Sequence, residues 1–499
     1  MFRRTIPILV VCLMLVAATA ARAGDFPKIT GFSPTGGPVG TLVTIAGSGF
    51  IGTTRVRFNG VSAQFTVDTA KRILATVPLG ATTGKIDVKK PLGTATSADD
   101  FVVGPGSGPP PSSSSWPQFQ HDAQRTGKSG ANGPSGSSVN LAWQYKSVSW
   151  IKNQTSIADD GTIYIGDSKF PLCSLKTGGS LEWCTNVGGF VDQSSPAIGN
   201  PFLKTDAQGS RTVDTIYIGD RNNIFWAIDE DGVDLWHFKV PLDGDVRQSP
   251  LLGPAPQSRV YAMCGCTVRG VVYAFDPNGT LVWSVDLPLV RDMSPAGIMF
   301  GGHFRIYVIT NNGKLFAIDD LGATGAIAWS LQLGATALHT SPSIGADGTI
   351  YVGTAAGVYA VKDNGTSGAV KPGWPFATSG GVDTAAAING GKIYLSSYNV
   401  GTRTLYAIDA TTNPPHVLWS LSGPGSSTTN LAQTPSPVIG ANGFVYAAIG
   451  ADIYGFDPAM GGTPKWHYQL PADAISLSIG NGALYVAAKD AMLYALTSP

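Results

Sequence analysis

Charged and amide side chains recur shortly before several short apolar strands, and these are the residues with which the chain could do chemistry. Arg247 and Arg291 hold matching positions in consecutive segments, and two neighbouring guanidinium groups could hold a carboxylate or a phosphate. Aspartates at matching positions of other segments could offer oxygens to a cation. The candidate ligand-binding residues are Asp192, Gln193, Arg247, Gln248, Arg291, Asp292, His339, Asp383 and Gln433.

A simpler interpretation of these residues stays open. If they line a water-filled channel, arginines and aspartates of neighbouring blades would simply neutralise one another without binding a ligand. His339 could carry a proton, because histidine titrates near neutrality, but hydrogen bonding alone also explains a single histidine. The chain has no Gly-x-Ser-x-Gly, phosphate-loop or His-Glu-x-x-His motif. We therefore expect no catalytic residue and no metal site, and we favour binding over catalysis.

The cysteines offer a second kind of chemistry. Four cysteines remain after the predicted signal peptide, and in an exported chain an even number permits disulfides. Four cysteines allow three connectivities. If Gly178-Gly179 is a two-residue hairpin turn, Cys173 and Cys184 lie directly opposite each other and within bridging reach. Cys264 and Cys266 are two residues apart and therefore share one face of a strand. They can form a bridge only if Gly265 bends the chain. The disulfide candidates are Cys173, Cys184, Cys264 and Cys266.

The elements that must position these residues form a repeat. One strand of each repeat contains a tyrosine after an apolar residue, and a later strand contains a tryptophan. The unit has four strands in roughly 45 residues, which is typical of a propeller blade. The eight tyrosines are Tyr164, Tyr217, Tyr261, Tyr307, Tyr351, Tyr394, Tyr446 and Tyr485. The eight tryptophans are Trp143, Trp183, Trp236, Trp283, Trp329, Trp374, Trp419 and Trp466.

The register of the repeat predicts how the ring closes. Trp143 precedes the first tyrosine strand, and no tryptophan strand follows Tyr485. We expect the strand at 141–143 to pair with the strand at 493–496 and complete the eighth blade, which removes an open sheet edge. The tryptophans are expected to fill the wedges between blades rather than to bind a substrate.

A smaller segment precedes the repeat. Residues 26–103 alternate short strands with glycine turns, and Phe58-Asn59-Gly60-Val61 is typical of a type I′ hairpin. Its start has the pattern Ile-x-x-Phe-x-Pro-x-x-Gly-x-x-Gly, followed by Val-Thr-Ile-x-Gly-x-x-Phe. This pattern resembles the IPT/TIG family of immunoglobulin-like domains. The resemblance implies a spacer or binding module without catalytic residues.

The repeat also resembles a known superfamily. The turn before the tryptophan strand follows Ala-Ile/Phe-Asp-x-x-Gly-x-x-x-Trp, as at Ala274, Asp276, Gly279 and Trp283. Residues 116–127 resemble the segment that precedes the first blade in the same families. The chain from 116 to 499 is thus similar to the PQQ-like repeat superfamily. That resemblance implies either a quinoprotein alcohol dehydrogenase, which binds pyrroloquinoline quinone (PQQ) and calcium, or a non-enzymatic propeller that binds proteins.

The sequence departs from both kinds of relative. The dehydrogenases generally carry two adjacent cysteines, whereas Gly265 separates Cys264 from Cys266 here. The dehydrogenases also hold calcium in long insertions between blades, and this chain has few such insertions. One non-enzymatic propeller of the superfamily, the outer-membrane assembly subunit, is a lipoprotein. Here Cys12 lies inside the apolar N-terminal run and far from its end, so we expect no lipid-bearing cysteine. We expect no cofactor. The alternative is that the protein binds PQQ and calcium, with the carboxylates of the quinone near Arg247 and Arg291.

Composition and the N-terminus indicate where the protein works. The chain has 33 basic and 33 acidic residues, and this balance argues against nucleic-acid or anionic-membrane binding. Arg3 and Arg4, the apolar run from 6 to 18 and the small residues up to Ala23 are typical of a cleaved signal peptide. We therefore expect a periplasmic, extracellular or cell-surface protein with no transmembrane segment after cleavage.

The predicted fold class is all-β: a small immunoglobulin-like β-sandwich followed by an eight-bladed β-propeller closed by pairing of its N- and C-terminal strands. The predicted parts are a signal peptide (1–23), an IPT/TIG domain (24–103), a Pro/Ser/Gly linker (104–115) and the propeller (116–499). The favoured function is a non-catalytic binding or scaffold protein for protein or glycan partners of the envelope or extracellular space. The alternatives are a PQQ-dependent oxidoreductase and a structural subunit of an outer-membrane assembly complex.

Overall fold

The computed structural model of the chain is built of β-strands, with one short 3₁₀ turn, η1 (Pro458–Met460), among the described residues. The predicted all-β fold class is thereby confirmed. No helix in the described part is long and apolar enough to cross a membrane. The structure describes residues 26–499 except 38–40, 64, 79–80, 82, 92, 104–114, 170–171, 186–188, 192, 207–208, 242–243, 256, 267–268, 289, 291–292 and 426–434, and it leaves out the side chains of 200–212 and Cys266. The predicted signal peptide and nearly all of the predicted linker lie outside these residues.

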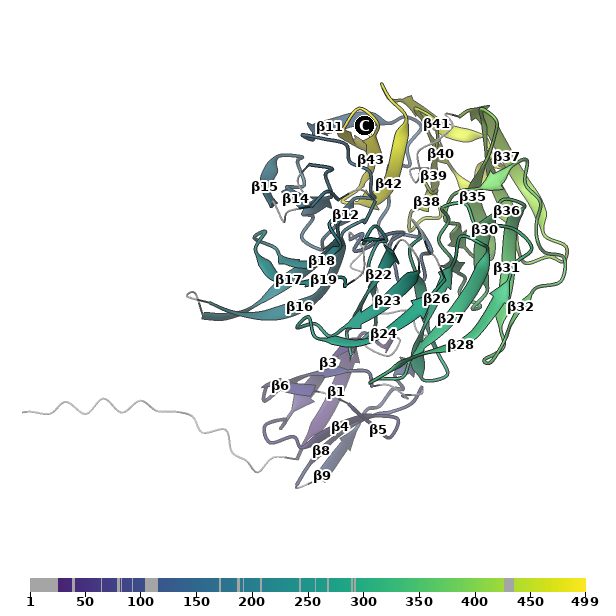
Figure 1. Ribbon diagram of the computed structural model, residues 1–499. Helices are drawn as coiled ribbons and strands as arrows, with labels where there is room; N and C mark the ends of the chain where they lie inside the picture. The colour runs from purple at the N-terminus through teal and green to yellow at the C-terminus, as the bar shows by residue number, and fades with distance from the viewer. Residues whose placement is uncertain are drawn as a thin grey trace, which may run out of the picture. The chain divides into compact units, whose positions relative to one another are not determined.

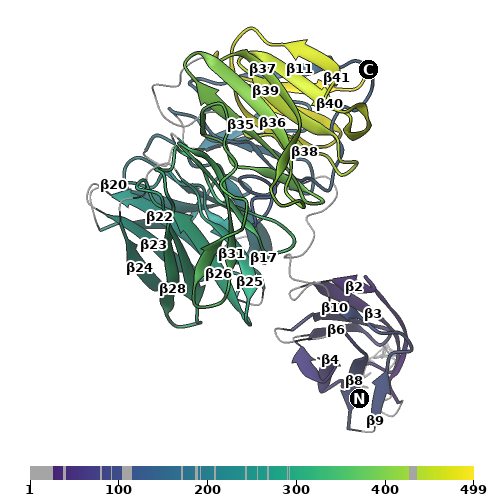
Figure 2. The same ribbon diagram turned by 90° about the vertical axis from the view of Figure 1, so that its right-hand side faces the viewer.

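The chain divides into two compact units, one made of residues 1–37 and 41–104 and the other of 38–40 and 105–499. The first unit is a sandwich of two four-stranded sheets and one two-stranded pair, shown in Figure 2. One sheet has the order β1-β3-β7-β6 and comprises β1 (Lys28–Ser33), β3 (Leu42–Ser48), β7 (Arg72–Thr76) and β6 (Phe65–Thr69). The other has the order β5-β4-β8-β9 and comprises β5 (Val61–Ala63), β4 (Arg55–Phe58), β8 (Ile86–Lys90) and β9 (Gly93–Thr96). The pair is β2 (Gly36–Gly37) with β10 (Val102–Val103).

Alternation of apolar and polar residues forms this sandwich. Val43 and Ile45 on β3 and Val56 and Phe58 on β4 are fully buried in one core, while the residues between them face outward. Phe58 pairs with Val61, and the two turn residues between them have φ of 43° and 87°. These angles are those of a type I′ turn, as predicted from the Asn-Gly dipeptide.

The second unit holds eight further sheets, labelled in Figure 1. We number them as blades in chain order. Blade 1 is β12 (Ser156–Ile157), β13 (Ile163–Ile165), β14 (Leu172–Leu175) and β15 (Leu181–Thr185); blade 2 is β16 (Ala197–Asp206), β17 (Gly209–Gly219), β18 (Ile224–Asp229) and β19 (Asp234–Lys239). Blade 3 is β20 (Gly244–Asp245), β21 (Leu251–Leu252), β22 (Val260–Cys266), β23 (Gly270–Phe275) and β24 (Leu281–Leu287); blade 4 is β25 (Ala296–Phe300), β26 (His303–Ile309), β27 (Lys314–Asp320) and β28 (Gly325–Gln332).

The remaining blades follow the same plan. Blade 5 is β29 (Ser343–Ile344), β30 (Ile350–Thr354), β31 (Gly357–Asp363) and β32 (Gly368–Val370); blade 6 is β33 (Gly381–Val382), β34 (Ala387–Asn389), β35 (Lys392–Asn399), β36 (Thr402–Asp409) and β37 (His416–Pro424). Blade 7 is β38 (Val438–Ile439), β39 (Val445–Ile449), β40 (Asp452–Phe456) and β41 (Pro464–Gln469). Blade 8 combines β11 (Asn140–Lys146) with β42 (Ala474–Gly480), β43 (Ala483–Ala488) and β44 (Met492–Thr497).

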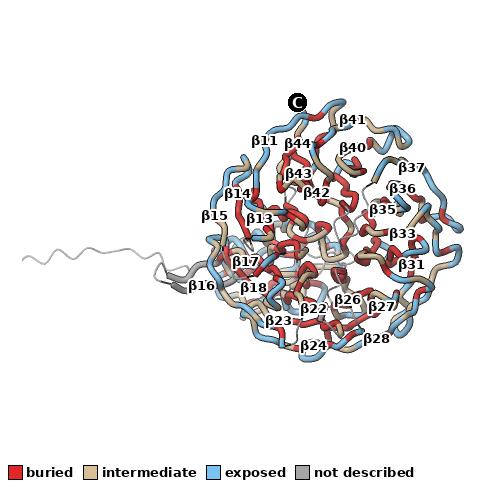
Figure 3. Tube along the Cα trace, turned by 45° about the horizontal axis from the view of Figure 1, so that its top comes forward, coloured by how far each residue is buried: buried red, intermediate tan, exposed pale blue. Residues whose placement is uncertain are grey.

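Blade 8 joins the two ends of the propeller sequence. Strand β11 pairs antiparallel with β44, with Leu141 opposite Leu496 and Trp143 opposite Ala495. Figure 3 shows the blades following one another around a ring, with buried stretches toward its centre and exposed stretches at its edge. The outermost strand of blade 8 therefore comes from the start of the propeller sequence and its three inner strands from the end.

Each blade contains one contact between its tyrosine and its tryptophan. The ring centroids of the eight pairs are 5.7–6.1 Å apart, and the pair in blade 8 joins Trp143 to Tyr485. Several indoles also reach the next blade: Nε1 of Trp183 donates to the carbonyl oxygen of Glu230 (2.9 Å), and Nε1 of Trp236 donates to that of Pro277 (3.1 Å). The tryptophans therefore pack between blades.

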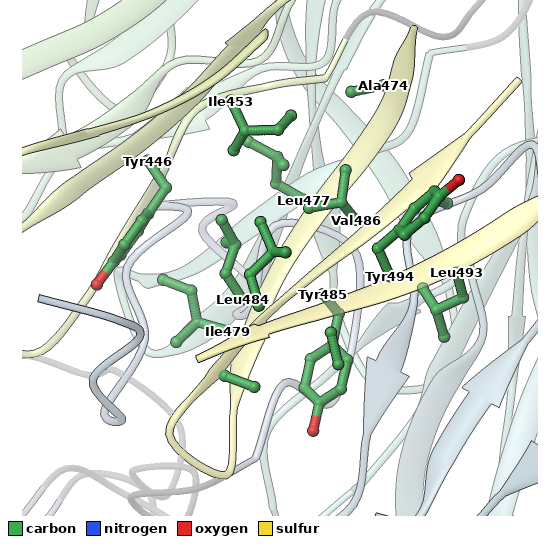
Figure 4. Packing of buried hydrophobic residues seen from close by; sticks show 14 of the residues in the cluster. Tyr446, Ile453, Ala474, Leu477, Ile479, Leu484, Tyr485, Val486, Leu493 and Tyr494 are labelled. Carbon is green, nitrogen blue, oxygen red and sulfur yellow. The ribbon is translucent and has the colours of Figure 1, made fainter. Parts of the chain in front are cut away.

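Adjacent blades share cores. Figure 4 shows Tyr446 and Ile453 of blade 7 packed against Leu477, Leu484 and other apolar residues of blade 8. These side chains are fully buried. Removal of this apolar surface from water holds one blade against the next.

The predicted hairpin turn of blade 1 differs from the structure in one detail. Gly179 N–H bonds to the Lys176 carbonyl oxygen (2.8 Å), Lys176 N–H bonds to that of Ser180 (2.9 Å), and Gly179 has φ of 82°. The turn is thus centred one residue earlier, at 177–178, and a β-bulge between Ser174 and Leu175 compensates for the shift. Beyond the bulge Cys173 and Cys184 are directly opposite and form a disulfide, with Cα atoms 4.0 Å apart.

Candidate functional site

A ring of serines lies where the innermost strands of the blades begin. The backbone N–H of Ser195 donates to Ser249 Oγ (3.0 Å), that of Ser249 to Ser294 Oγ (2.9 Å), and that of Ser294 to Ser341 Oγ (2.9 Å). On the other side of the ring, the N–H of Ala385 donates to Ser436 Oγ (3.0 Å). Each bond joins one blade to the next, so these hydroxyls hold the innermost strands together. Each of these serines is followed by a proline in the sequence.

Residues 116–131, which we call the axial segment, hydrogen-bond to the innermost strands. Its carbonyl oxygens accept backbone N–H groups of Ile157, Ile198, Gly297, Ile344, Ile388 and Ile439, at 2.7–2.9 Å. Gln118 Oε1 also accepts the N–H of Leu252 (3.2 Å). Blades 1 to 7 therefore all bond to one continuous segment. The segment forms a floor in the centre of the ring.

Arg125 anchors the axial segment. Its side chain is fully buried and donates to the carbonyl oxygens of Pro295 (2.9 Å), Pro250 (2.8 Å) and Phe119 (2.7 Å) and to Gln118 Oε1 (3.2 Å). Burial lowers the pKa of this guanidinium to about 9, and the charge of Asp122 opposes that shift. The group therefore stays protonated at neutral pH and crosslinks blades 3 and 4 through the floor.

A hollow of about 650 Å³, including space open to solvent, lies over this floor. We call it the mouth pocket. Amide, hydroxyl and charged groups from many blades converge on it, as is usual for ligand sites. Its lining residues are Phe119, Gln120, Lys152, Asn153, Gln154, Gln193, Ser195, Arg247, Ser249, Ser294, His339, Ser341, Asp383, Ala385, Ser436, Ile475, Ser476 and Leu477.

The structure places four of the predicted ligand-binding residues, Gln193, Arg247, His339 and Asp383, in the lining of the mouth pocket. Gln248 does not line it. Its side chain is buried, and its Nε2 would lie 3.0 Å from a Cβ added to Gly265 on β22. The other predicted residues, Asp192, Arg291, Asp292 and Gln433, lie outside the described residues.

Two charge pairs of the described lining form within single blades. Arg247 pairs with Asp245 of its own blade. Asp383 receives both terminal nitrogens of Arg403, at 2.9 and 3.0 Å, again from the same blade. Lys152 is a further cation of the lining, and its Nζ lies 5.6 Å from the ring centre of Trp150.

The described lining does not fit the calcium–quinone centre of the dehydrogenases. Calcium sites use carboxylates to balance the charge of the ion, whereas Asp383 is the one carboxylate in the described lining and is already held by Arg403. No group of three or more acidic, histidine or cysteine side chains among the described residues is arranged to hold a metal. Cys264 is disulfide-bonded, but the side chain of Cys266 lies outside the described part.

Sequence reasoning missed Gln120, which lines the pocket, and two exposed aromatic residues on loops that also carry lining residues. Gln120 lies in the floor with its side chain fully buried. Trp150 and Phe190 stand on the loops that enter blades 1 and 2, and they are 55% and 57% exposed. None follows the repeat, so the periodic pattern could not reveal them. An aromatic residue two or three positions before a pocket residue is the only signal that the sequence carries.

Comparison with known families agrees with this architecture. A family model described as "Outer membrane protein assembly factor BamB" matches residues 268–497, and the IPT/TIG domain model matches residues 27–102. The chain thus contains a PQQ-like propeller preceded by an IPT/TIG domain. No curated protein matches the sequence significantly.

Several solved structures share the fold. BamB from Moraxella catarrhalis is 15% identical, with a TM-score of 0.51 over 72% of this chain and 99% of that one. A europium-containing methanol dehydrogenase is 13% identical, with a TM-score of 0.51 over 75% and 89%. Sqt1 from Saccharomyces cerevisiae is 11% identical, with a TM-score of 0.52 over 74% and 99%. At these identities the likeness concerns the fold alone.

Proposed function

We propose that this protein is a non-catalytic binding protein of the cell envelope or extracellular space and that the mouth pocket holds its ligand. One observation carries the proposal: the axial segment bonds to seven blades and forms a fixed floor, over which polar and cationic groups converge. A preorganised pocket of this kind binds without the cost of ordering its walls.

The way the pocket groups are engaged supports binding over catalysis. The serine hydroxyls accept backbone hydrogen bonds from neighbouring blades, and Asp383 is held by Arg403. A general acid or base must exchange a proton with its substrate, so a carboxylate fixed in a bidentate ion pair is poorly placed for that role. The export pattern of residues 1–23 supports the proposed location.

A second candidate is a protein-binding subunit of an outer-membrane assembly complex. The match of residues 268–497 to the BamB family model favours it. In this case the exposed Trp150 and Phe190 would contact the partner protein, because aromatic side chains are enriched at the centres of protein interfaces. The mouth of the propeller is the binding surface in both candidates.

Binding to isolated envelope fractions tests the role of this surface. The double variant Trp150→Ala/Phe190→Ala should bind about tenfold less than the wild-type protein in a co-sedimentation titration, because it loses the exposed rings of the loops that enter blades 1 and 2. The matched control is Leu181→Ala/Leu281→Ala, which removes two exposed apolar side chains from outermost strands. If both double variants lost binding equally, or if Trp150→Ala/Phe190→Ala bound as well as the wild-type protein, the mouth would have no part in the proposed function.

A further inference from the structure

We propose that the mouth pocket binds an oxyanion, a phosphate, sulfate or carboxylate group, on the axis of the propeller. This inference rests on the proposed function and names the chemical class of the ligand for its site. It is carried by five buried serine hydroxyls that surround the pocket at one level, accept backbone N–H groups and donate to no group of the described residues.

The five serines stand at a common level above the floor. Each lies three residues before a residue whose N–H bonds to the axial segment, so the innermost strands carry the hydroxyls at matching positions. All five line the mouth pocket and are at most 8% exposed. The serines and the residues that bond to the floor are Ser195 with Ile198, Ser249 with Leu252, Ser294 with Gly297, Ser341 with Ile344 and Ser436 with Ile439.

The hydrogens of these hydroxyls are available to a ligand. A serine hydroxyl donates one hydrogen and accepts through two lone pairs. Ser195 Oγ accepts the N–H of Gln154 (3.0 Å), and Ser436 Oγ accepts that of Ala385 (3.0 Å). Each of the other three accepts the N–H of the serine before it in the ring, at 2.9–3.0 Å. Within the described part of the chain none of the five donates a hydrogen bond, so all five hydrogens can turn toward the pocket.

A ring of hydroxyl donors calls for a ligand that accepts several hydrogen bonds at one place. Phosphate, sulfate and carboxylate groups present several acceptor oxygens, and hydrogen bonds to ionised oxygens are about twice as strong as those between neutral groups. The backbone N–H that bonds to each serine oxygen polarises the hydroxyl and makes its hydrogen a better donor. Neutral donors fixed around one point can hold a negative group without a facing cation.

Two other positions of the same lining differ from the five serines in ways that a test can use. Ser476 also lines the pocket, but its Oγ donates to the Asn153 carbonyl oxygen (2.9 Å), so its hydrogen is already used. Ala385 holds the ring position in blade 6, because it lies three residues before Ile388, whose N–H bonds to the axial segment. Loss of the Ser476 hydroxyl should therefore not affect the ligand, whereas a hydroxyl at position 385 should add a donor to the ring.

Calorimetric titration of the purified full-length mature protein with sodium phosphate, sodium sulfate and sodium acetate tests this inference. Sodium chloride keeps the ionic strength constant, so charge screening is the same in every titration. We expect saturable binding of at least one of the three oxyanions, with a Kd of about 1 mM or lower. The oxyanion that binds most tightly identifies the group that the ligand carries. If none of the three bound saturably, the inference would be overturned.

Three single variants test whether the serine ring holds the anion. Ser294→Ala removes one donor of the ring and should weaken oxyanion binding about tenfold, because hydrogen bonds to charged groups are among the strongest in proteins. Ser476→Ala removes a hydroxyl whose hydrogen is already used and should change the affinity by less than about twofold. Ala385→Ser should tighten binding by about threefold or more. Equal weakening in the two alanine variants, or unchanged affinity in Ala385→Ser, would overturn the inference.

Urea unfolding shows whether each variant is folded at the temperature of the titration. If Ser294→Ala does not fold, Ala385→Ser decides the question alone, because it removes no hydrogen bond of the ring. Envelope binding that depends on Trp150 and Phe190 in a protein that binds no oxyanion would leave the proposed function intact and remove only this inference. Absence of both kinds of binding would remove both.

Discussion

Replacing Arg125 with alanine should lower the free energy of unfolding of the propeller by about 4 kcal/mol. The substitution removes every side-chain donor that satisfies the carbonyl oxygens of Pro250 and Pro295 in the centre of the ring. Each buried acceptor left without a donor costs about 1–3 kcal/mol, and the cavity left by the side chain adds to the loss. Arg125→Lys should recover only part of it, because an ammonium group cannot reach several carbonyls in one plane as a guanidinium does.

Urea unfolding followed by tryptophan fluorescence measures this effect. All 11 tryptophans lie at or beyond residue 116, so their fluorescence reports the propeller and not the IPT/TIG domain. The matched control is Arg269→Ala, which removes an exposed arginine paired with Asp286 and should change stability by less than about 0.5 kcal/mol. If Arg125→Ala were no more damaging than Arg269→Ala, the axial segment would not be the anchored floor described above.

Gly179→Ala should destabilise the propeller by about 2–4 kcal/mol. Gly179 has φ of 82°, which a residue with a Cβ adopts only at a cost, and a Cβ here would collide with the indole ring of Trp143. Trp143 stands on β11, the strand that completes blade 8. The substitution would therefore disturb the contact by which blade 8 packs against blade 1.

The preceding residue of the same turn provides the control. Gly178 does not have a positive φ, and a Cβ added there would meet no atom within 4 Å. Gly178→Ala should leave stability within about 1 kcal/mol of wild type, or raise it slightly by restricting the unfolded chain. Thermal unfolding of the two variants, with the Cys173–Cys184 disulfide intact, compares them directly. Similar melting temperatures would refute the proposed contact between Trp143 and the turn.

Much of the fold could be predicted because packing in a propeller repeats. A tyrosine and a tryptophan must meet in every blade, so they recur along the sequence, and the unmatched Trp143 indicated which strand completes blade 8. The turn of blade 1 was placed one residue too late, because a bulge that absorbs one residue leaves no mark in the alternation of side chains.

The site was less predictable for physical reasons. The floor depends on carbonyl oxygens of the axial segment and N–H groups far along the chain, and backbone bonds leave no side-chain pattern. Whether arginines and aspartates of neighbouring blades also pair stays a prediction, because Asp192, Arg291 and Asp292 lie outside the described residues. The pair of Arg403 with Asp383 depends on the arrangement of strands within blade 6, which the sequence pattern does not mark. The exposed Trp150 and Phe190 follow no repeat, and only the structure shows that the Trp150 ring contacts Lys152 of the lining.

Titration with PQQ in excess calcium, followed by dye reduction with simple alcohols and sugars, most directly tests the claim that this propeller binds rather than catalyses. The account predicts no dye reduction above the protein-free rate, because the one carboxylate of the described lining, Asp383, is already paired with Arg403 and offers calcium little charge compensation. Saturable PQQ binding with dye turnover, both lost in Arg247→Ala, would contradict it and make the protein a quinoprotein oxidoreductase.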